Sequence, residues 1–162
     1  MNSRKVARYA LLISLAMVLS WLESLIPIAT AIPGMKLGLT NLVVLFALYR
    51  MGTADAGMIS LIRVLLVSLT FGNAYAFAYS FAGAVLSLLI MLALKKSGKF
   101  STVGVSIAGG VGHNLGQIIV ASLVLKTEKI FFYFPVLMVS GIAAGICIGI
   151  LGGIITERLK KL

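Results

Sequence analysis

The run FYFPVLMVSGIAAGICIGILGGIIT, residues 132–156, decides the class of fold. It carries no charged residue and is longer than the ~20 residues that an α-helix needs to cross the hydrocarbon core of a bilayer. Within it, Gly141, Gly145, Gly149 and Gly153 recur every fourth residue and therefore share one helix face. Such a stripe lets another helix approach closely, inside the same chain or from another subunit. The run predicts a closely packed membrane helix.

The rest of the chain has the same character. Of its 162 residues, 60% are hydrophobic and only 11% are charged, whereas a soluble domain is about a quarter charged. Five more apolar runs lie near residues 6–26, 38–50, 54–71, 76–94 and 103–125. We therefore expect an all-α integral membrane protein, with a single compact domain of six transmembrane helices over residues 1–162. Because the run 38–50 is too short for a straight span, the preceding residues are expected to dip into the membrane.

Basic residues make the formal net charge +10, but they lie in short clusters at the ends of the apolar runs. That placement is typical of topology signals, so we expect no nucleic-acid partner. Ten basic residues fall on one side of the predicted bundle: Arg4, Lys5, Arg8, Arg50, Lys95, Lys96, Lys99, Arg158, Lys160 and Lys161. Since positive loops stay in the cytoplasm, both termini are predicted to be cytoplasmic.

The segment IPGMKLGLTN, residues 32–41, interrupts the apolar pattern. It places Lys36 beside helix-breaking residues, between two apolar runs and on the predicted outer side. In lipid, irregular backbone survives only against a cavity or other protein. The segment therefore predicts a cavity-lining element of a small-molecule site.

Polar residues at membrane depth are the other candidates, because each is costly unless it faces a cavity or a partner. The candidate substrate-binding residues are Glu23, Lys36, Asn41, Arg63, Asn73, Tyr79, His113, Asn114 and Gln117. Those in the predicted outer half, together with Tyr75, are expected to converge on one pocket. The alternatives are an ion pair between Glu23 and Lys36, interfacial anchoring by the tyrosines, and purely structural hydrogen bonds from Arg63 and His113.

Catalysis is not expected from this residue inventory. The four acidic residues, Glu23, Asp55, Glu128 and Glu157, lie on separate segments, so no carboxylate pair is available for magnesium. One histidine and one cysteine cannot build a zinc site, and no phosphate-binding Gly-Lys-Ser/Thr loop occurs. We expect no cofactor and no metal, and any transport would draw its energy from partners or an ion gradient.

Three segments carry a resemblance to a known family: PGMKLGLTN at 33–41, RVLL at 63–66 leading to FGN at 71–73, and GHNLGQ at 112–117. The chain resembles the Gx transporter family, also called heptaprenyl diphosphate synthase component I. More broadly it is similar to the substrate-binding (S) components of energy-coupling factor transporters. The resemblance spans nearly the whole chain.

That resemblance implies a component of the bacterial cytoplasmic membrane that captures a small molecule from outside, such as a vitamin or a quinone or isoprenoid precursor. Its partners would be a coupling subunit and two cytoplasmic ATPases, with Ala10 and Ser14 of the first helix docking the coupling subunit. It also implies that Lys36 and Asn41 lie near the ligand. The alternative is a noncatalytic membrane subunit of a prenyl diphosphate synthase or of a quinone- or flavin-linked electron-transfer system.

Overall fold

The structure, a computed structural model, describes residues 3–25 and 38–159. These residues form six α-helices and one short 3-10 helix, and no strand occurs among them. The elements are α1 (Ser3–Ser24), α3 (Asn41–Arg50), α4 (Thr53–Phe71), α5 (Ala74–Ser97), α6 (Thr102–Leu125), η1 (Glu128–Tyr133) and α7 (Phe134–Arg158). The prediction of an all-α bundle is confirmed, and the predicted runs match the helices closely.

Five helical segments in the described part of the chain are long and apolar enough to cross a membrane. They are α1, α4, α5, α6 and the continuous stretch of η1 and α7. The exception is α3, whose 10 residues extend only about 15 Å, half the thickness of the hydrocarbon core. The chain is therefore a multi-pass membrane protein, and the shortness expected of the second run is real.

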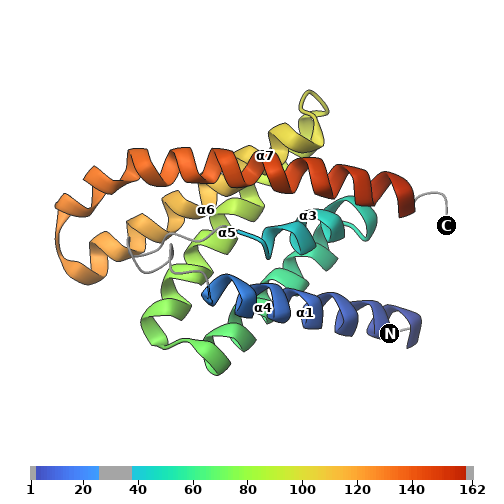
Figure 1. Cartoon of the computed structure of the whole chain (residues 1–162), viewed down its shortest axis with the longest axis horizontal. Helices are drawn as coiled ribbons and strands as arrows, with labels where there is room; N and C mark the ends of the chain where they lie inside the picture. Colours follow the sequence, from blue (N-terminus) through green and yellow to red (C-terminus); the bar gives the residue numbers. More distant parts are fainter. Residues whose placement is uncertain (1–2, 26–37, 160–162) are drawn as a thin grey trace.

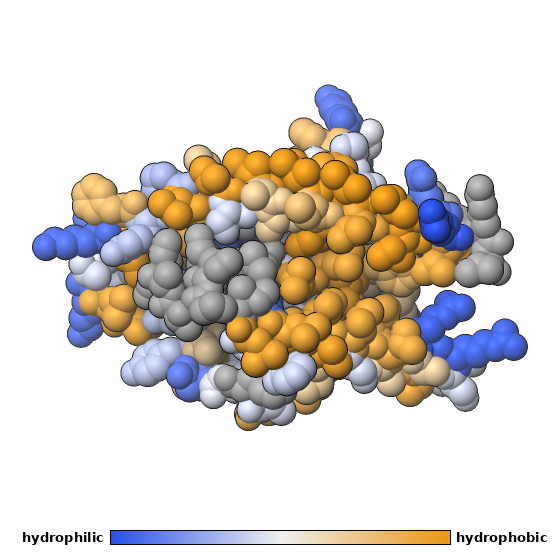
Figure 2. All heavy atoms as spheres, viewed as in Figure 1, coloured by the Kyte–Doolittle hydropathy of each residue, from blue (hydrophilic) through white to orange (hydrophobic). Residues whose placement is uncertain are grey.

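Polar contacts join the helix ends on one side of the bundle. Lys5 of α1 pairs with Asp55 of α4 at 2.7 Å, and Arg50 of α3 donates to the carbonyl of Leu159, just beyond α7, at 2.8 Å. Lys95 of α5 donates to a backbone carbonyl near the end of α3. The start of α1 and the end of α7 lie on this side in Figure 1, and Figure 2 shows hydrophilic side chains projecting there beyond an apolar middle. We call it the basic end.

The glycine stripe of α7 packs against α6, inside the chain. A Cβ atom on Gly145 would lie 2.5 Å from the Cα of Ile107, and one on Gly149 would be almost as close to the backbone of α6. Gly141 meets the same helix at 3.0 Å, but Gly153 has no atom within 4 Å of its Cβ position. The stripe therefore explains the close approach of α7 to α6 over three of its four members, and the fourth does not take part.

A second set of glycines brings α6 against α5. A Cβ on Gly116 would lie 2.6 Å from the carbonyl oxygen of Ala82, and one on Gly112 would lie 2.5 Å from the side chain of Ile90. Residues three and four apart share a helix face, so α6 presents one glycine-bearing face to α5 and another to α7. This makes α6 the centre of the helix packing and fixes the depth at which its polar residues lie.

Candidate functional site

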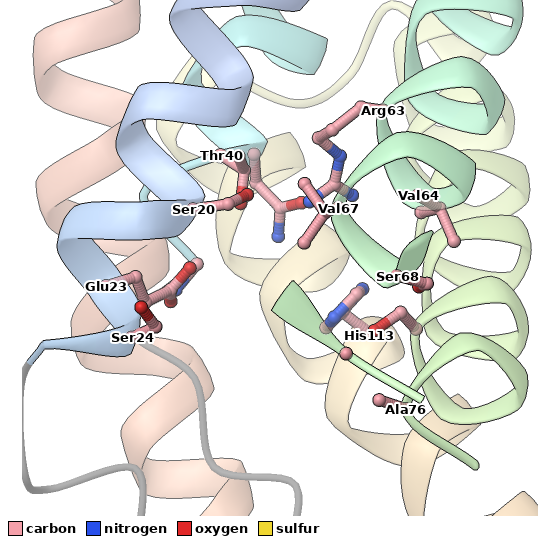
Figure 3. Close-up of a pocket in the computed structure, with 14 residues that line it drawn as sticks. Ser20, Glu23, Ser24, Thr40, Arg63, Val64, Val67, Ser68, Ala76 and His113 are labelled. Carbon is pink, nitrogen blue, oxygen red and sulfur yellow. The ribbon is translucent and has the colours of Figure 1, made fainter. Parts of the chain in front are cut away.

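A cavity of about 260 Å³ lies in the half of the bundle opposite the basic end (Figure 3). The end of α1, the start of α3, the second half of α4 and the start of α5 form its walls, and α6 contributes one residue. The described residues that line it are Ser20, Glu23, Ser24, Gly38, Thr40, Asn41, Arg63, Val64, Val67, Ser68, Gly72, Ala76, Ser80 and His113. Polar side chains from five helices thus gather within a membrane bundle, where each would otherwise be costly.

Glu23 forms part of the wall that α1 contributes. Ser20, three residues earlier on the same helix face, and the adjacent Ser24 line the same wall. Its side chain is only 4% exposed, and its carboxylate accepts a hydrogen bond from the backbone N–H of Gly38. Gly38 has a φ of +75°, which favours glycine. The carboxylate therefore holds the chain just before α3 against α1, and so fixes one side of the cavity.

Arg63 lies on the opposite wall, on the face of α4 that also carries Val64, Val67 and Ser68 (Figure 3). Its side chain is 7% exposed. Its Nε and Nη2 atoms are buried, and neither has a hydrogen-bond partner among the described residues. Glu23 lines the same cavity, but no direct ion pair joins it to Arg63 within residues 3–25 and 38–159. A buried guanidinium without its hydrogen bonds destabilises the empty bundle.

His113 reaches the cavity from the middle of α6 and is 6% exposed. The facing residue of α5 is Gly83, where a Cβ would lie 2.8 Å from the carbonyl oxygen of His113 and 2.9 Å from its Nδ1. No side chain fits at this position without displacing the histidine. The absence of a side chain on Gly83 therefore sets where the imidazole stands, beside Ser68 and Ala76 in Figure 3.

Five hydroxyl groups at the cavity were not among the predicted residues: Ser20, Ser24, Thr40, Ser68 and Ser80. A signal for two of them existed, because Ser20 lies three residues before Glu23 and four before Ser24, so it shares a helix face with each. The other three carry no such mark, since single hydroxyl residues are common in membrane helices and pack equally well between helices.

Of the predicted residues, Glu23, Asn41, Arg63 and His113 line the cavity. Asn114 is buried beside it and donates from Nδ2 to the carbonyl of Leu137 at 2.6 Å, which ties α6 to α7. It also borders a narrow void, shared with Asn41 and His113, that adjoins the cavity. Asn114 therefore has a helix-linking contact as well as a place next to the site.

The remaining predicted residues lie elsewhere or outside the described part. Gln117 is buried in α6 but does not line the cavity. Asn73 is exposed and caps α5, accepting from the N–H of Ala76 at 2.9 Å. Tyr79 packs on a separate apolar cluster of α6, η1 and α7, and Tyr75 is 62% exposed. The structure thus brings Glu23 and Asn41 to one cavity but not Asn73 or the two tyrosines, and substrate binding by any of them stays a prediction.

Lys36 lies outside the described residues, as does the rest of 26–37. Its role at the site, and its pairing with Glu23, stay predictions. On α1, the two proposed docking residues Ala10 and Ser14 are exposed. Ala16 by contrast is fully buried. The small residues of α1 therefore divide between the outer surface and the bundle interior.

The described residues hold no group of three or more histidine, cysteine, aspartate or glutamate side chains arranged to bind a metal ion. The polar chemistry of the cavity is instead that of hydrogen bonding and charge, with one guanidinium, one carboxylate, one imidazole, an amide and several hydroxyls. Such a set can bind and orient a small molecule.

Comparison with known proteins gives one match. The family model described as heptaprenyl diphosphate synthase component I matches residues 12–155, which include every described residue that lines the cavity. No curated protein and no solved structure matches the chain.

Proposed function

Because the chain belongs to the heptaprenyl diphosphate synthase component I family, we propose that its cavity binds a small molecule and that the chain is the substrate-binding component of an energy-coupling factor type transporter. The observation that carries this proposal is the buried Arg63 at the wall of a cavity within the bundle, whose Nε and Nη2 have no hydrogen-bond partner in residues 3–25 and 38–159. A purely structural arginine would have its donors satisfied by neighbouring carbonyls. A ligand oxygen would supply the missing partner.

The charges on the walls point to the class of ligand. Arg63 and His113 are on one side and Glu23 is on the α1 side (Figure 3). We infer a ligand with a carboxylate, phosphate or carbonyl group that accepts from Arg63 and His113. Hydrogen-bond donors on the same molecule would face Glu23 and the α1 hydroxyls. A volume of about 260 Å³ is just below the usual range of roughly 300–1,000 Å³ for small-molecule sites, so the ligand is small.

The binding function is tested on gently purified protein by native mass spectrometry. We expect a retained small molecule bearing an acidic or carbonyl group, released when the protein is denatured. Rebinding of that compound, measured by calorimetry, should weaken at least tenfold in Arg63→Gln, because a lost hydrogen bond to a charged group costs about 1.5–3 kcal/mol. Lys36→Ala, proposed from the sequence, should also weaken it. Unchanged affinity in Arg63→Gln would remove Arg63 from the site.

The transport role is tested by the partners that co-purify. We expect a membrane coupling subunit and two ATPases, docked on the exposed small residues of α1. A double change of Ala10→Leu and Ser14→Leu should abolish their co-purification while leaving ligand affinity intact. Ala143→Leu, at an exposed small residue of α7, is the matched control and should have no effect.

A second function is favoured by the family description itself, which names a component of a prenyl diphosphate synthase. In that case the chain is a noncatalytic membrane subunit, and a soluble prenyl synthase should co-purify with it. The same pulldown separates the two functions. Recovery of the soluble synthase without ATPases would replace the transport proposal.

A further inference from the structure

Two adjoining hollows open at the basic end, far from the cavity described above. One, of about 440 Å³, is lined by Arg4, Lys5, Arg8, Arg50, Met51 and Asp55. The other, of about 340 Å³, is lined by Arg8, Leu11, Leu12, Phe46, Arg50, Met51 and Leu159. Arg8, Arg50 and Met51 belong to both, so the two hollows form one cleft between α1, α3 and the end of α7. We call it the basic-end cleft.

The first hollow carries a surplus of positive charge. Among the residues that the structure describes, four basic side chains line it against a single carboxylate, that of Asp55. This carboxylate is already engaged, because Oδ1 of Asp55 accepts from the Tyr9 hydroxyl at 2.6 Å and pairs with Lys5 at 2.7 Å. The negative charge of Asp55 is therefore neutralised by Lys5. Arg8 and Arg50 remain as cations that the hollow's own acid does not pair.

The second hollow is apolar apart from the same two arginines. Leu11 of α1 is 68% exposed beside it, while Leu12 and Phe46 form its floor as buried and half-buried side chains. Arg50 is held in place at the border, since its Nη2 donates to the carbonyl of Leu159. The cleft therefore changes from cationic to apolar over the length of two helix turns of α1, from Arg4 to Leu11.

We propose that the basic-end cleft binds one anionic phospholipid, with its phosphate between Arg8 and Arg50 and an acyl chain along Leu11 and Phe46. Arginine guanidinium groups bind phosphate oxygens through paired, charge-assisted hydrogen bonds. Basic pockets between helices at the membrane surface suit lipid headgroups. A soluble phosphate would leave the apolar hollow unused, and a zwitterionic lipid would bring its own cation toward the arginines.

The proposal is tested by adding phosphatidylglycerol or phosphatidylcholine with identical acyl chains to the detergent-purified full chain, and counting lipid adducts by native mass spectrometry. Each basic residue near a membrane surface contributes about fivefold to anionic lipid binding. We therefore expect phosphatidylglycerol to be favoured over phosphatidylcholine by at least about fivefold. Arg8→Gln should lower its binding about fivefold, and Arg8→Gln with Arg50→Gln about 25-fold. Arg8→Gln leaves the Arg50 contact to Leu159 intact.

The matched control is Lys96→Gln with Lys99→Gln, which removes the same charge from exposed positions that do not line the cleft. This control should keep its preference for phosphatidylglycerol. A competition arm with glycerol 3-phosphate should displace no lipid at equal concentration, because that anion has no acyl chain. Equal binding of the two lipids, an equal loss in the control, or displacement by glycerol 3-phosphate would each overturn the proposal.

Discussion

Replacing Arg63 by methionine is expected to stabilise the empty protein while it removes ligand binding. Two guanidinium nitrogens of Arg63 are buried without a partner among the described residues, and each unmet donor costs about 1–3 kcal/mol. Methionine fills a similar volume without these donors. Removing a positive charge from the cavity that Glu23 also lines works in the opposite direction, so we expect a net gain of about 2 kcal/mol.

A gain of this size raises the melting midpoint of a chain of 150–250 residues by about 4–8 °C. The assay is thermal unfolding of ligand-free protein in detergent, followed by circular dichroism, alongside native mass spectrometry of retained ligand. Arg63→Lys, which keeps the charge, should show no gain in stability. Ser87→Ala provides a second comparison, since the buried Ser87 hydroxyl also lacks a partner among the described residues but does not line the cavity. It should leave ligand retention unchanged.

The reasoning is refuted if Arg63→Met lowers the melting midpoint of the empty protein. That result would mean that the arginine stabilises the fold and that its burial reflects a structural role. A raised midpoint with ligand retention intact would instead separate Arg63 from the binding site.

Three further predictions concern packing and the cavity wall. Gly145→Ala should lower the melting midpoint sharply or prevent folding, because its Cβ would lie 2.5 Å from a backbone atom of α6. Gly153→Ala, with open space around its Cβ, should have the melting midpoint of the parent protein. Equal losses in the two variants would contradict the packing of α7 on α6. Asn114→Leu should destabilise by about 1–3 kcal/mol in the same melting assay, since the carbonyl of Leu137 loses its buried donor; an unchanged midpoint would argue against that contact. Glu23→Ala should weaken ligand binding in calorimetry more than Glu23→Gln, because glutamine keeps an acceptor for the backbone N–H before α3; equal affinities would show that this anchor does not shape the site.

The fold class could be predicted from the sequence because hydrophobic run length is nearly sufficient to define helices in a membrane. The same reasoning found α3 too short to span, and placed the glycines of α7 on one face. It could not tell that Gly153 lies beyond the contact with α6, because where two crossing helices separate depends on their crossing geometry. Sequence spacing predicts the glycine stripe of α7, but how many of its glycines contact α6 follows only from the packing of the two helices.

The site was predicted only in part, for reasons visible in the GHNLGQ segment. His113 and Asn114 are adjacent, so they point about 100° apart, one toward the cavity and the other toward α7. Gln117 shares the face of His113 but lies about 6 Å further along the helix, beyond the cavity wall. A cluster of polar residues in the sequence therefore indicates how deep in the membrane a site lies. Which of these residues lines the cavity depends on how the neighbouring helices pack around them.

The walls of the cavity differ in how firmly they are held. Ten residues of α6 are buried, against three of α1, namely Leu12, Ala16 and Glu23. Glycines lock α6 to both its neighbours at backbone distance, whereas α1 contains no glycine at all. Lys5 and Tyr9 bind Asp55 at the basic end, so a movement of α1 is easiest at its other end, beside the cavity. We expect ligand to enter and leave past that end of α1, which requires the hydrogen bond between Gly38 and Glu23 to break, while His113 stays fixed on α6.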